Sequence, residues 1–318
     1  MAHGRLTAAD MSRQPDVLAR VVERNGDALD AARRILAGRR VVRFGGLGSS
    51  RHVAGYGAET LEQLADQPAA VLAAPGAAVP LTRLEADQAV VLVSQSGETP
   101  ALLEVARHAR KAGCAVLAVV NADAAPLGEL ADVSLHCHAG RERVVAATAS
   151  VTAQMLLLRG LAAEVTPGTV RDLAQAVAQL TDATMNVGAL PPQHVVAGGF
   201  AAQWVADEIA LKLAEMAHRL ATSESLVDHL HGPAAVLVPT VAFLEPADPN
   251  TAAVARMPHV RTLGPGPAFD VELPGTGDPS LDAVVRVVAG QVLALTWSRR
   301  LGVDADDPRG LAKVTRTA

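Results

Sequence analysis

Residues 88–112 read QAVVLVSQSGETPALLEVARHARKA. Residues 88–93 contain a continuous apolar run, which is typical of a strand buried on both faces of a parallel sheet. The polar loop of residues 94–99, called here the SQSGET loop, follows at once. A helix is predicted over residues 101–112, with Thr99 as its N-cap and Pro100 at its first position. A strand, a loop and a helix in direct succession predict an α/β fold.

The same alternation extends outward from this stretch through the first half of the chain. The predicted helices cover residues 7–38, 52–64, 126–131 and 145–165, and the predicted strands cover residues 40–44, 69–74, 114–120 and 133–138. Strands that alternate with helices predict a parallel sheet with helices on both faces, a flavodoxin-like three-layer sandwich.

The pattern then restarts after a linking helix predicted over residues 170–185. Strand residues 194–197 run into Gly198 and Gly199, as the earlier strand 40–44 runs into the glycine-rich residues 45–50. The later elements are a helix over residues 201–220, strands over 234–239, 241–244, 259–263 and 269–273, and a helix over 281–302. We therefore expect a duplicated α/β unit with domains at residues 1–165 and 166–318.

Composition excludes several classes of protein. The 318 residues carry a net charge of −5 and only 2% aromatic residues, which argues against a nucleic-acid partner. Clean apolar runs such as residues 115–120 are far shorter than the ~20 residues that span a bilayer, and residues 1–5 open no secretory signal, so no membrane partner is expected. Two cysteines, Cys114 and Cys137, fit a reducing cytoplasm.

The SQSGET loop has the chemistry of a phosphate site. It offers three hydroxyls, a flexible glycine and the first backbone N–H groups of a helix, whose dipole favours an anion. A polar helix-capping turn is the alternative. Residues 45–50 (GGLGSS), called here the first glycine loop, match neither a dinucleotide fingerprint nor a Walker loop, because Arg51 takes the third glycine position and no Gly-Lys-Ser/Thr follows.

Here the sequence resembles the SIS (sugar isomerase) domain family, and most closely the isomerase half of glucosamine-6-phosphate synthase. The SQSGET loop resembles the family signature. Further blocks agree in the same order: residues 48–50 (GSS), 142–152 (ERVVAATASVT), 210–215 (ALKLAE), 231–233 (HGP) and 303–313 (VDADDPRGLAK). The resemblance implies two tandem SIS domains and no cofactor.

The resemblance also assigns roles to individual residues. It implies that Ser94, Gln95, Ser96 and Thr99 bind the sugar phosphate. Ser50 and the backbone of Val145 would hold sugar hydroxyls.

The catalytic roles that the resemblance implies fall in the second half of the chain. Glu215 would move a proton between C1 and C2, and Lys212 would lie near the sugar carbonyl or hold Glu215. His231 would open the sugar ring from the neighbouring subunit of a homodimer. Lys313 would form a Schiff base with the open-chain ketose, which requires a neutral amine and hence a lowered lysine pKa.

The implied activity is aldose–ketose isomerisation coupled to loss of an amine from an amino-sugar 6-phosphate. Residue 2 is Ala and too few residues precede the first strand for a glutaminase domain, so glutamine hydrolysis is not expected. Two alternatives stay open: a fructosamine-phosphate deglycase and a non-catalytic sugar-phosphate sensor. Ala147, Ala149 and Thr222 replace polar or charged residues of the family pattern, which leaves the sugar undefined.

Two smaller features remain. His136 and His138 could present two imidazoles on one side of a strand, but a metal site needs further ligands, and no metal is expected there. His229 is read as a surface residue. The chain has only three lysines, Lys111, Lys212 and Lys313, and two of them fall on the catalytic blocks, which favours a site that depends on an amine.

Overall fold

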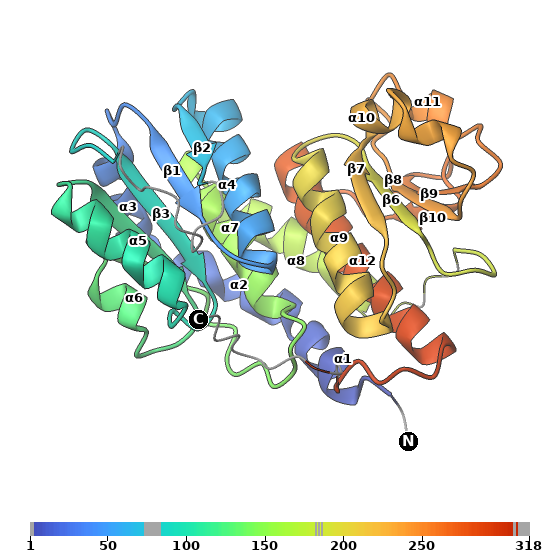
Figure 1. The fold of residues 1–318 in the computed structure, drawn as a ribbon, viewed down its shortest axis with the longest axis horizontal. Helices are drawn as coiled ribbons and strands as arrows, with labels where there is room; N and C mark the ends of the chain where they lie inside the picture. Colours follow the sequence, from blue (N-terminus) through green and yellow to red (C-terminus); the bar gives the residue numbers. More distant parts are fainter. Residues whose placement is uncertain are drawn as a thin grey trace. The chain divides into compact units, whose positions relative to one another are not determined.

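The computed structural model describes residues 3–72, 84–181, 183, 185, 187–307 and 310. It contains two five-stranded sheets in which every strand pairing is parallel (Figure 1). The first sheet has the order β2 (Ala69–Val71), β1 (Val42–Gly45), β3 (Ala89–Ser94), β4 (Ala115–Val120), β5 (Val133–His136). The second has the order β7 (Thr222–Ser225), β6 (His194–Ala197), β8 (Thr240–Phe243), β9 (Val260–Pro265), β10 (Val271–Leu273).

Both sheets therefore follow one pattern, in which the first strand of each lies between the second and the third. This is the flavodoxin-like order 2-1-3-4-5. The prediction of an α/β fold with two parallel sheets is confirmed. The helices are α1 (Arg5–Ser12), α2 (Gln14–Arg24), α3 (Gly26–Leu36), α4 (Ser49–Ala65), α5 (Pro100–Lys111), α6 (Pro126–Glu129), α7 (Ala149–Ala162), α8 (Pro167–Thr181), α9 (Ala202–Ala217), α10 (Leu226–Leu230), α11 (Thr251–Val254) and α12 (Pro279–Arg300), with a 3₁₀ turn η1 (Pro233–Ala235).

Several predicted elements differ from the structure. The single helix expected over residues 7–38 is three helices, because Pro15 cannot continue a helix that precedes it and Asn25 turns its side chain toward β5. Asn25 Nδ2 donates to the carbonyl of His136, and His136 N donates back to Asn25 Oδ1. The strand expected over residues 234–239 is wrong: η1 and a loop lie there. β7, α10 and α11 were not predicted.

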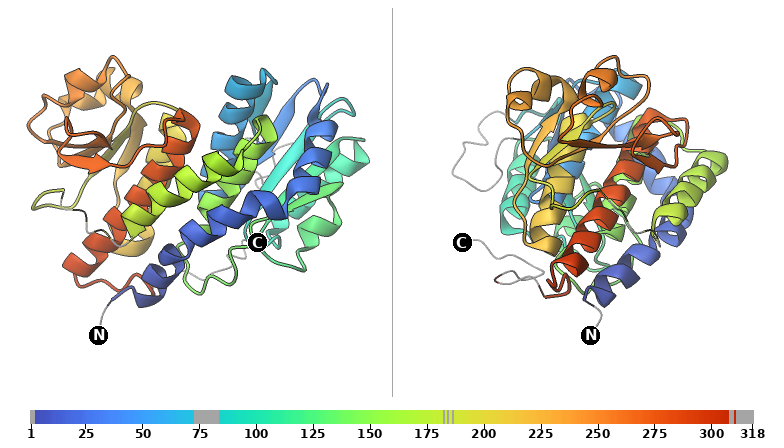
Figure 2. Two further views of the ribbon diagram at one scale, coloured as in Figure 1. Left: turned by 180° about the vertical axis from the view of Figure 1, so that it is seen from behind. Right: turned by 90° about the vertical axis from the view of Figure 1, so that its right-hand side faces the viewer.

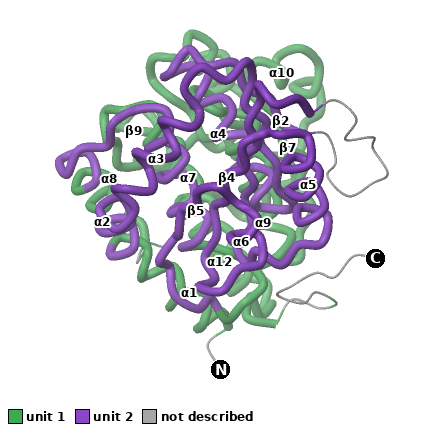
Figure 3. The backbone as a smooth tube through the Cα atoms, turned by 90° about the vertical axis from the view of Figure 1, so that its left-hand side faces the viewer, with its two compact units in different colours: residues 1–15, 143–148, 171–311 green, residues 16–142, 149–170, 312–318 purple. Residues whose placement is uncertain are grey.

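The chain divides into two compact units (Figure 3). Within the described residues, the first-sheet unit (unit 2 in the figure) comprises residues 16–142 and 149–170. The second-sheet unit (unit 1) comprises residues 1–15, 143–148 and 171–311. This division differs from a boundary at residue 165 because the N-terminal segment pairs with the end of the chain: Gly4 N donates to Asp304, and Thr7 N donates to Asp306.

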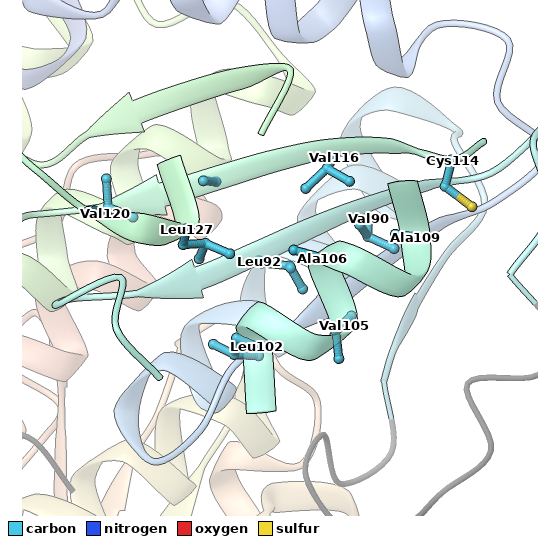
Figure 4. Close-up of a cluster of buried hydrophobic side chains, with 12 residues drawn as sticks. Val90, Leu92, Leu102, Val105, Ala106, Ala109, Cys114, Val116, Val120 and Leu127 are labelled. Carbon is cyan, nitrogen blue, oxygen red and sulfur yellow. The ribbon is translucent and has the colours of Figure 1, made fainter. Parts of the chain in front are cut away.

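The core of the first-sheet unit fixes the start of α5. Leu92 and Val90 of β3 pack against Leu102 and Val105 of α5, all within 1% of complete burial (Figure 4). Burial of each such side chain contributes about 1.5–3 kcal/mol. The SQSGET loop that joins β3 to α5 is therefore held at both of its ends by buried apolar side chains.

α12 packs along α9 in the second-sheet unit (Figure 2). Among the described residues it is the one helix long and apolar enough to cross a membrane. Polar residues interrupt its apolar ones, so the sequence shows no continuous apolar run of that length. However, 94% of its most apolar window is buried inside the protein, as in a core helix.

Candidate functional site

The SQSGET loop leaves the carboxyl end of β3, and its own side chains shape it. Ser94 is buried, and its Oγ accepts a hydrogen bond from Gly97 N at 3.0 Å and lies 3.1 Å from Thr99 Oγ1. Thr99 occupies the N-cap position of α5 but makes no side-chain bond to the helix backbone. Ser94 and Thr99 thus brace the two ends of the loop against each other.

Gly97 is required by the shape of this loop. Its φ of +66° lies in the left-handed region, and a Cβ there would come within 2.4 Å of Ala125 Cβ. Gly97 O also accepts a hydrogen bond from Leu127 N at 3.0 Å, which ties the loop to the start of α6. The backbone of the loop is therefore fixed before any ligand arrives.

The partly exposed side chains of the loop are Gln95, Ser96 and Thr99. They lie around the N-terminus of α5, where the helix dipole and the first N–H groups favour an anion. Of the four loop residues predicted to bind phosphate, Ser94 is the buried one, whereas the Ser96 and Thr99 hydroxyls, which also hydrogen-bond within the loop, are partly exposed. This burial favours a role for Ser94 in positioning the loop.

The first glycine loop lies at the neighbouring strand end. β1 pairs with β3 along its whole length, so the carboxyl ends of the two strands share one edge of the sheet. Ser50 is in the first turn of α4. Gly46 permits this turn, since a Cβ at Gly46 would come within 2.1 Å of Ser50 O. The structure thus brings Ser50 and the SQSGET loop to adjacent strand ends, as the sequence predicted.

A cavity of about 510 Å³ adjoins the SQSGET loop within the first-sheet unit. Gln95, Ser96 and Glu98 line one side, and the rest of the wall carries charges of both signs, from Arg24, Arg141, Asp123 and Glu142. Asn121, which sequence analysis did not identify, joins the loops around it. Asn121 N donates to Gln95 O at 3.0 Å, and its side-chain amide donates to Gly140 O at 2.8 Å. Its only sequence signal was its place directly after a buried strand.

The second-sheet unit contains a buried charge cluster on α9. Lys212 is fully buried, and its Nζ lies 2.5 Å from Glu215 Oε2 and 3.4 Å from Glu208 Oε1. Burial alone would lower the pKa of Lys212, but the charges of Glu208 and Glu215 outweigh burial and raise it. Lys212 is therefore an ammonium ion that holds Glu215. Of the two roles expected for Lys212, near the sugar carbonyl or holding Glu215, the second is the one for which the structure shows a contact.

Two of the remaining predicted residues lie on other elements than α9. His231 is exposed and caps the C-terminus of α10, where its N–H donates to Asp228 O at 3.0 Å. Val145 lies in the loop before α7, because that helix begins at Ala149 and not at residue 145. Lys313 lies outside the described residues.

The SIS domain family model matches residues 35–163, which contain the first sheet and both of its ligand-facing loops. The chain contains a domain of the SIS family. The isomerising glutamine–fructose-6-phosphate aminotransferase of Thermococcus kodakarensis is 28% identical over 341 residues, which cover 96% of this chain and 56% of that protein. The chain thus spans about half the length of the curated relatives it matches.

Two solved structures resemble nearly the whole chain in fold. Tagatose-6-phosphate ketose/aldose isomerase from Escherichia coli gives a TM-score of 0.81 at 20% identity and covers 99% of this chain and 98% of that one. Glucosamine-6-phosphate deaminase from Thermotoga maritima gives 0.79 at 21% identity, with 97% and 98% covered. At such identities these likenesses establish the fold.

The second sheet repeats the strand order of the first, but a side chain of its own unit occupies the equivalent strand ends. Arg286 of α12 is buried, and its guanidinium donates to Gly198 O at 2.6 Å, to Phe200 O at 2.9 Å and to Glu245 Oε1 at 2.5 Å. Gly198 follows β6 and Glu245 follows β8, so this ion pair occupies the strand ends that correspond to Ser50 and the SQSGET loop. In the second sheet, the Glu245 carboxylate and its paired guanidinium therefore fill the strand ends.

Two expectations about histidines need revision. His138 is not on the strand with His136, because β5 ends at His136 and His138 adopts a φ of +51°. The two rings are close, but His136 Nδ1 accepts a hydrogen bond from His138 N and is committed to the backbone. The expectation that His229 is a surface residue is wrong: it is completely buried and hydrogen-bonded to His194.

Proposed function

We propose that this protein binds a phosphorylated sugar and catalyses aldose–ketose isomerisation with loss of ammonia from an amino-sugar 6-phosphate. The phosphate would lie at the SQSGET loop, bound by Gln95, Ser96, Thr99 and the N-terminus of α5. Ser50 and the backbone of Val145 would bind sugar hydroxyls.

The observation that carries the enzymatic proposal is the Lys212–Glu215 pair. A fully buried ammonium holds a partly exposed carboxylate in one position, and proton transfer at carbon needs a base whose geometry is fixed. A sugar-phosphate sensor would need the phosphate loop but no such base. The second candidate, a deglycase, would use the same Glu215 and His231 on a fructosamine phosphate.

The proposed reaction balances as an amino sugar plus water giving a ketose and ammonia. His231 would transfer protons as the ring opens. Glu215 would then remove the proton from C2 and return it to C1, which converts the open-chain aldose into a C2 imine. Water adds to this imine and ammonia leaves. Alternatively, the neutral amine of Lys313 would displace ammonia from the C2 imine to form a Schiff base with the ketose, and water would then hydrolyse this Schiff base to release the ketose and restore the amine.

A substrate panel tests the proposal. Glucosamine 6-phosphate, fructose 6-phosphate and a fructosamine 6-phosphate are incubated with the protein, and ammonia and ketose are measured. We expect ammonia and fructose 6-phosphate from glucosamine 6-phosphate. Release of an amine from the fructosamine phosphate alone would favour the deglycase. Binding without turnover of any member would favour the sensor.

We also propose that His231 acts across a homodimer, because its exposed position at the end of α10 suits a residue offered to a second copy. Mixing the Glu215→Gln and His231→Ala variants tests this. A mixed dimer restores one complete site if His231 acts in trans, so activity should return on mixing two inactive proteins. No recovery would contradict the shared site. The buried, free cysteines Cys114 and Cys137 support the proposed cytoplasmic location.

A further inference from the structure

Three potential metal ligands converge in the second-sheet unit, away from the ligand-facing strand ends. His194 is the first residue of β6, Glu224 belongs to β7, and His229 belongs to α10. β6 and β7 pair in register, with His194 opposite Thr222, so His194 and Glu224 lie on the same face of the sheet. α10 packs on both strands and brings His229 to that face.

The distances among the three ligand atoms match a four-coordinate metal. His194 Nε2 lies 3.0 Å from His229 Nδ1 and 3.6 Å from Glu224 Oε2, and His229 Nδ1 lies 3.9 Å from Glu224 Oε2. A tetrahedral ion with bonds of about 2.0–2.1 Å separates its ligands by about 3.3 Å. The three observed separations lie on either side of this value, so small side-chain movements would bring all three atoms within bonding distance of one ion.

A count of protons indicates why a cation suits this cluster. His194 Nδ1 lies 2.5 Å from Thr222 Oγ1, and that hydroxyl donates to Gln193 O. His194 therefore carries its proton on Nδ1 and presents a lone pair from Nε2. His229 can supply one proton to the cluster at most. If it donates to His194, Glu224 Oε2 is left without a donor.

The buried atoms around the cluster show this deficit directly. Glu224 Oε2 and His229 Nε2 are buried and have no hydrogen-bond partner among the residues that the structure describes. The same holds for both ring nitrogens of His259, in the loop before β9. Unpaired buried polar atoms are costly and rare in folded proteins. A divalent ion would satisfy the facing lone pairs of His194, Glu224 and His229 together.

We propose that His194 Nε2, His229 Nδ1 and Glu224 Oε2 bind a divalent transition metal of the zinc class. Two imidazoles and a carboxylate suit Zn²⁺, whereas Mg²⁺ and Ca²⁺ prefer all-oxygen sites. The Thr222 hydroxyl supplies the outer hydrogen bond that orients a ligating histidine. The metal would join β6, β7 and α10.

A metal at this site would also affect the position of His231. His231 follows His229 by two residues, at the end of the same short helix. A five-residue helix has little stability of its own. A metal bond at His229 would therefore fix the direction in which His231 leaves α10. This positioning role rests on the proposed function, but metal binding itself does not.

Metal stoichiometry tests the proposal without any use of turnover. The metal-stripped full chain is titrated with Zn²⁺ against a chromophoric chelator, and with Co²⁺ while its visible absorption is followed. Wild type should bind one ion per chain, and the Co²⁺ form should show the intense bands of four-coordination. Glu224→Gln and His229→Gln should weaken binding at least tenfold. The control His108→Gln removes an exposed histidine on α5 and should bind like wild type.

Two measurements on the wild-type protein test metal binding even if a variant fails to fold. In wild type, saturating Zn²⁺ should raise the melting temperature by about 5 °C or more. Nitrogen-15 spectra of the histidine rings should show one ring bound through Nε2 and one through Nδ1. Absence of zinc binding by wild type, or the same stoichiometry and affinity in Glu224→Gln, would overturn the proposal.

Discussion

Lys212 Nζ lies 2.5 Å from Glu215 Oε2, and the Lys212 side chain has no exposed surface. An ammonium ion removed from water in this way needs its anionic partners, and here the chain supplies two of them, Glu208 and Glu215, within one turn of α9 on either side. The cluster therefore contributes in two ways: it holds the proposed base, and it makes the stability of α9 depend on one lysine.

Lys212→Met should be strongly destabilising. Removal of the ammonium leaves Glu208 and Glu215 facing each other with no cation between them, and loss of one partner from a buried ion pair typically costs about 3–5 kcal/mol. Urea denaturation measures the change. Lys111→Met, at the exposed end of α5, is the matched control and should stay within about 0.5 kcal/mol of wild type. A small effect at Lys212 would mean that the pair is not needed for folding.

Gly97→Ala should disturb the SQSGET loop. The new Cβ adds both left-handed backbone strain and a clash with Ala125, for a cost of about 1–3 kcal/mol and a clear loss of sugar-phosphate affinity. Gly38→Ala provides the control, since Gly38 has a φ of +75° but nothing within 4 Å of its Cβ position. Isothermal titration with a sugar phosphate should show weaker binding only for Gly97→Ala. Equal effects of the two substitutions would contradict the role of the close packing.

The carboxylate of Asp304 should contribute to acid sensitivity. Hydrogen bonds from Gly4 N and then Asp306 N lower its pKa below the ordinary value of 3.8. A lowered folded-state pKa gives stability above the unfolded value, and this stability is lost as the pH falls through the folded one. Asp304→Asn should thus be less stable than wild type at about pH 6, and the difference should shrink as the pH falls below the ordinary value of 3.8 and through the lower folded-state pKa. Urea denaturation at a series of pH values checks this, and a gap that does not change with pH would refute it.

The Arg286–Glu245 ion pair predicts one sugar phosphate per chain. Because the guanidinium already occupies the strand ends of the second sheet, only the first sheet has a free cradle at the equivalent position. Calorimetric titration with glucosamine 6-phosphate should give one site per chain. That site should be lost in a Ser96→Ala, Thr99→Ala double variant. Two sites of similar affinity would show that the second loop also accepts a phosphate.

The first half of the fold was predictable because its strands are continuous apolar runs bounded by polar loops. The 88–93 strand and the Thr99-Pro100 helix start lie within two residues of their predicted places. β7 was missed because Thr222–Ser225 is polar and becomes a strand only by pairing with β6. His229 was misjudged for the same reason: its partner His194 is 35 residues away, and no local pattern reports that pairing. Arg286, 88 residues from Gly198, could not be placed without the packing of α12.

Turnover by the Glu215→Gln variant tests the central claim most directly. Ammonia and fructose 6-phosphate released from glucosamine 6-phosphate would be measured for wild type, Glu215→Gln and the exposed control Glu272→Gln on β10. If Glu215 moves the proton between C2 and C1, its variant should lose about 10²–10⁴-fold in kcat while KM changes little, and Glu272→Gln should match wild type. Equal turnover by Glu215→Gln and wild type would contradict the account.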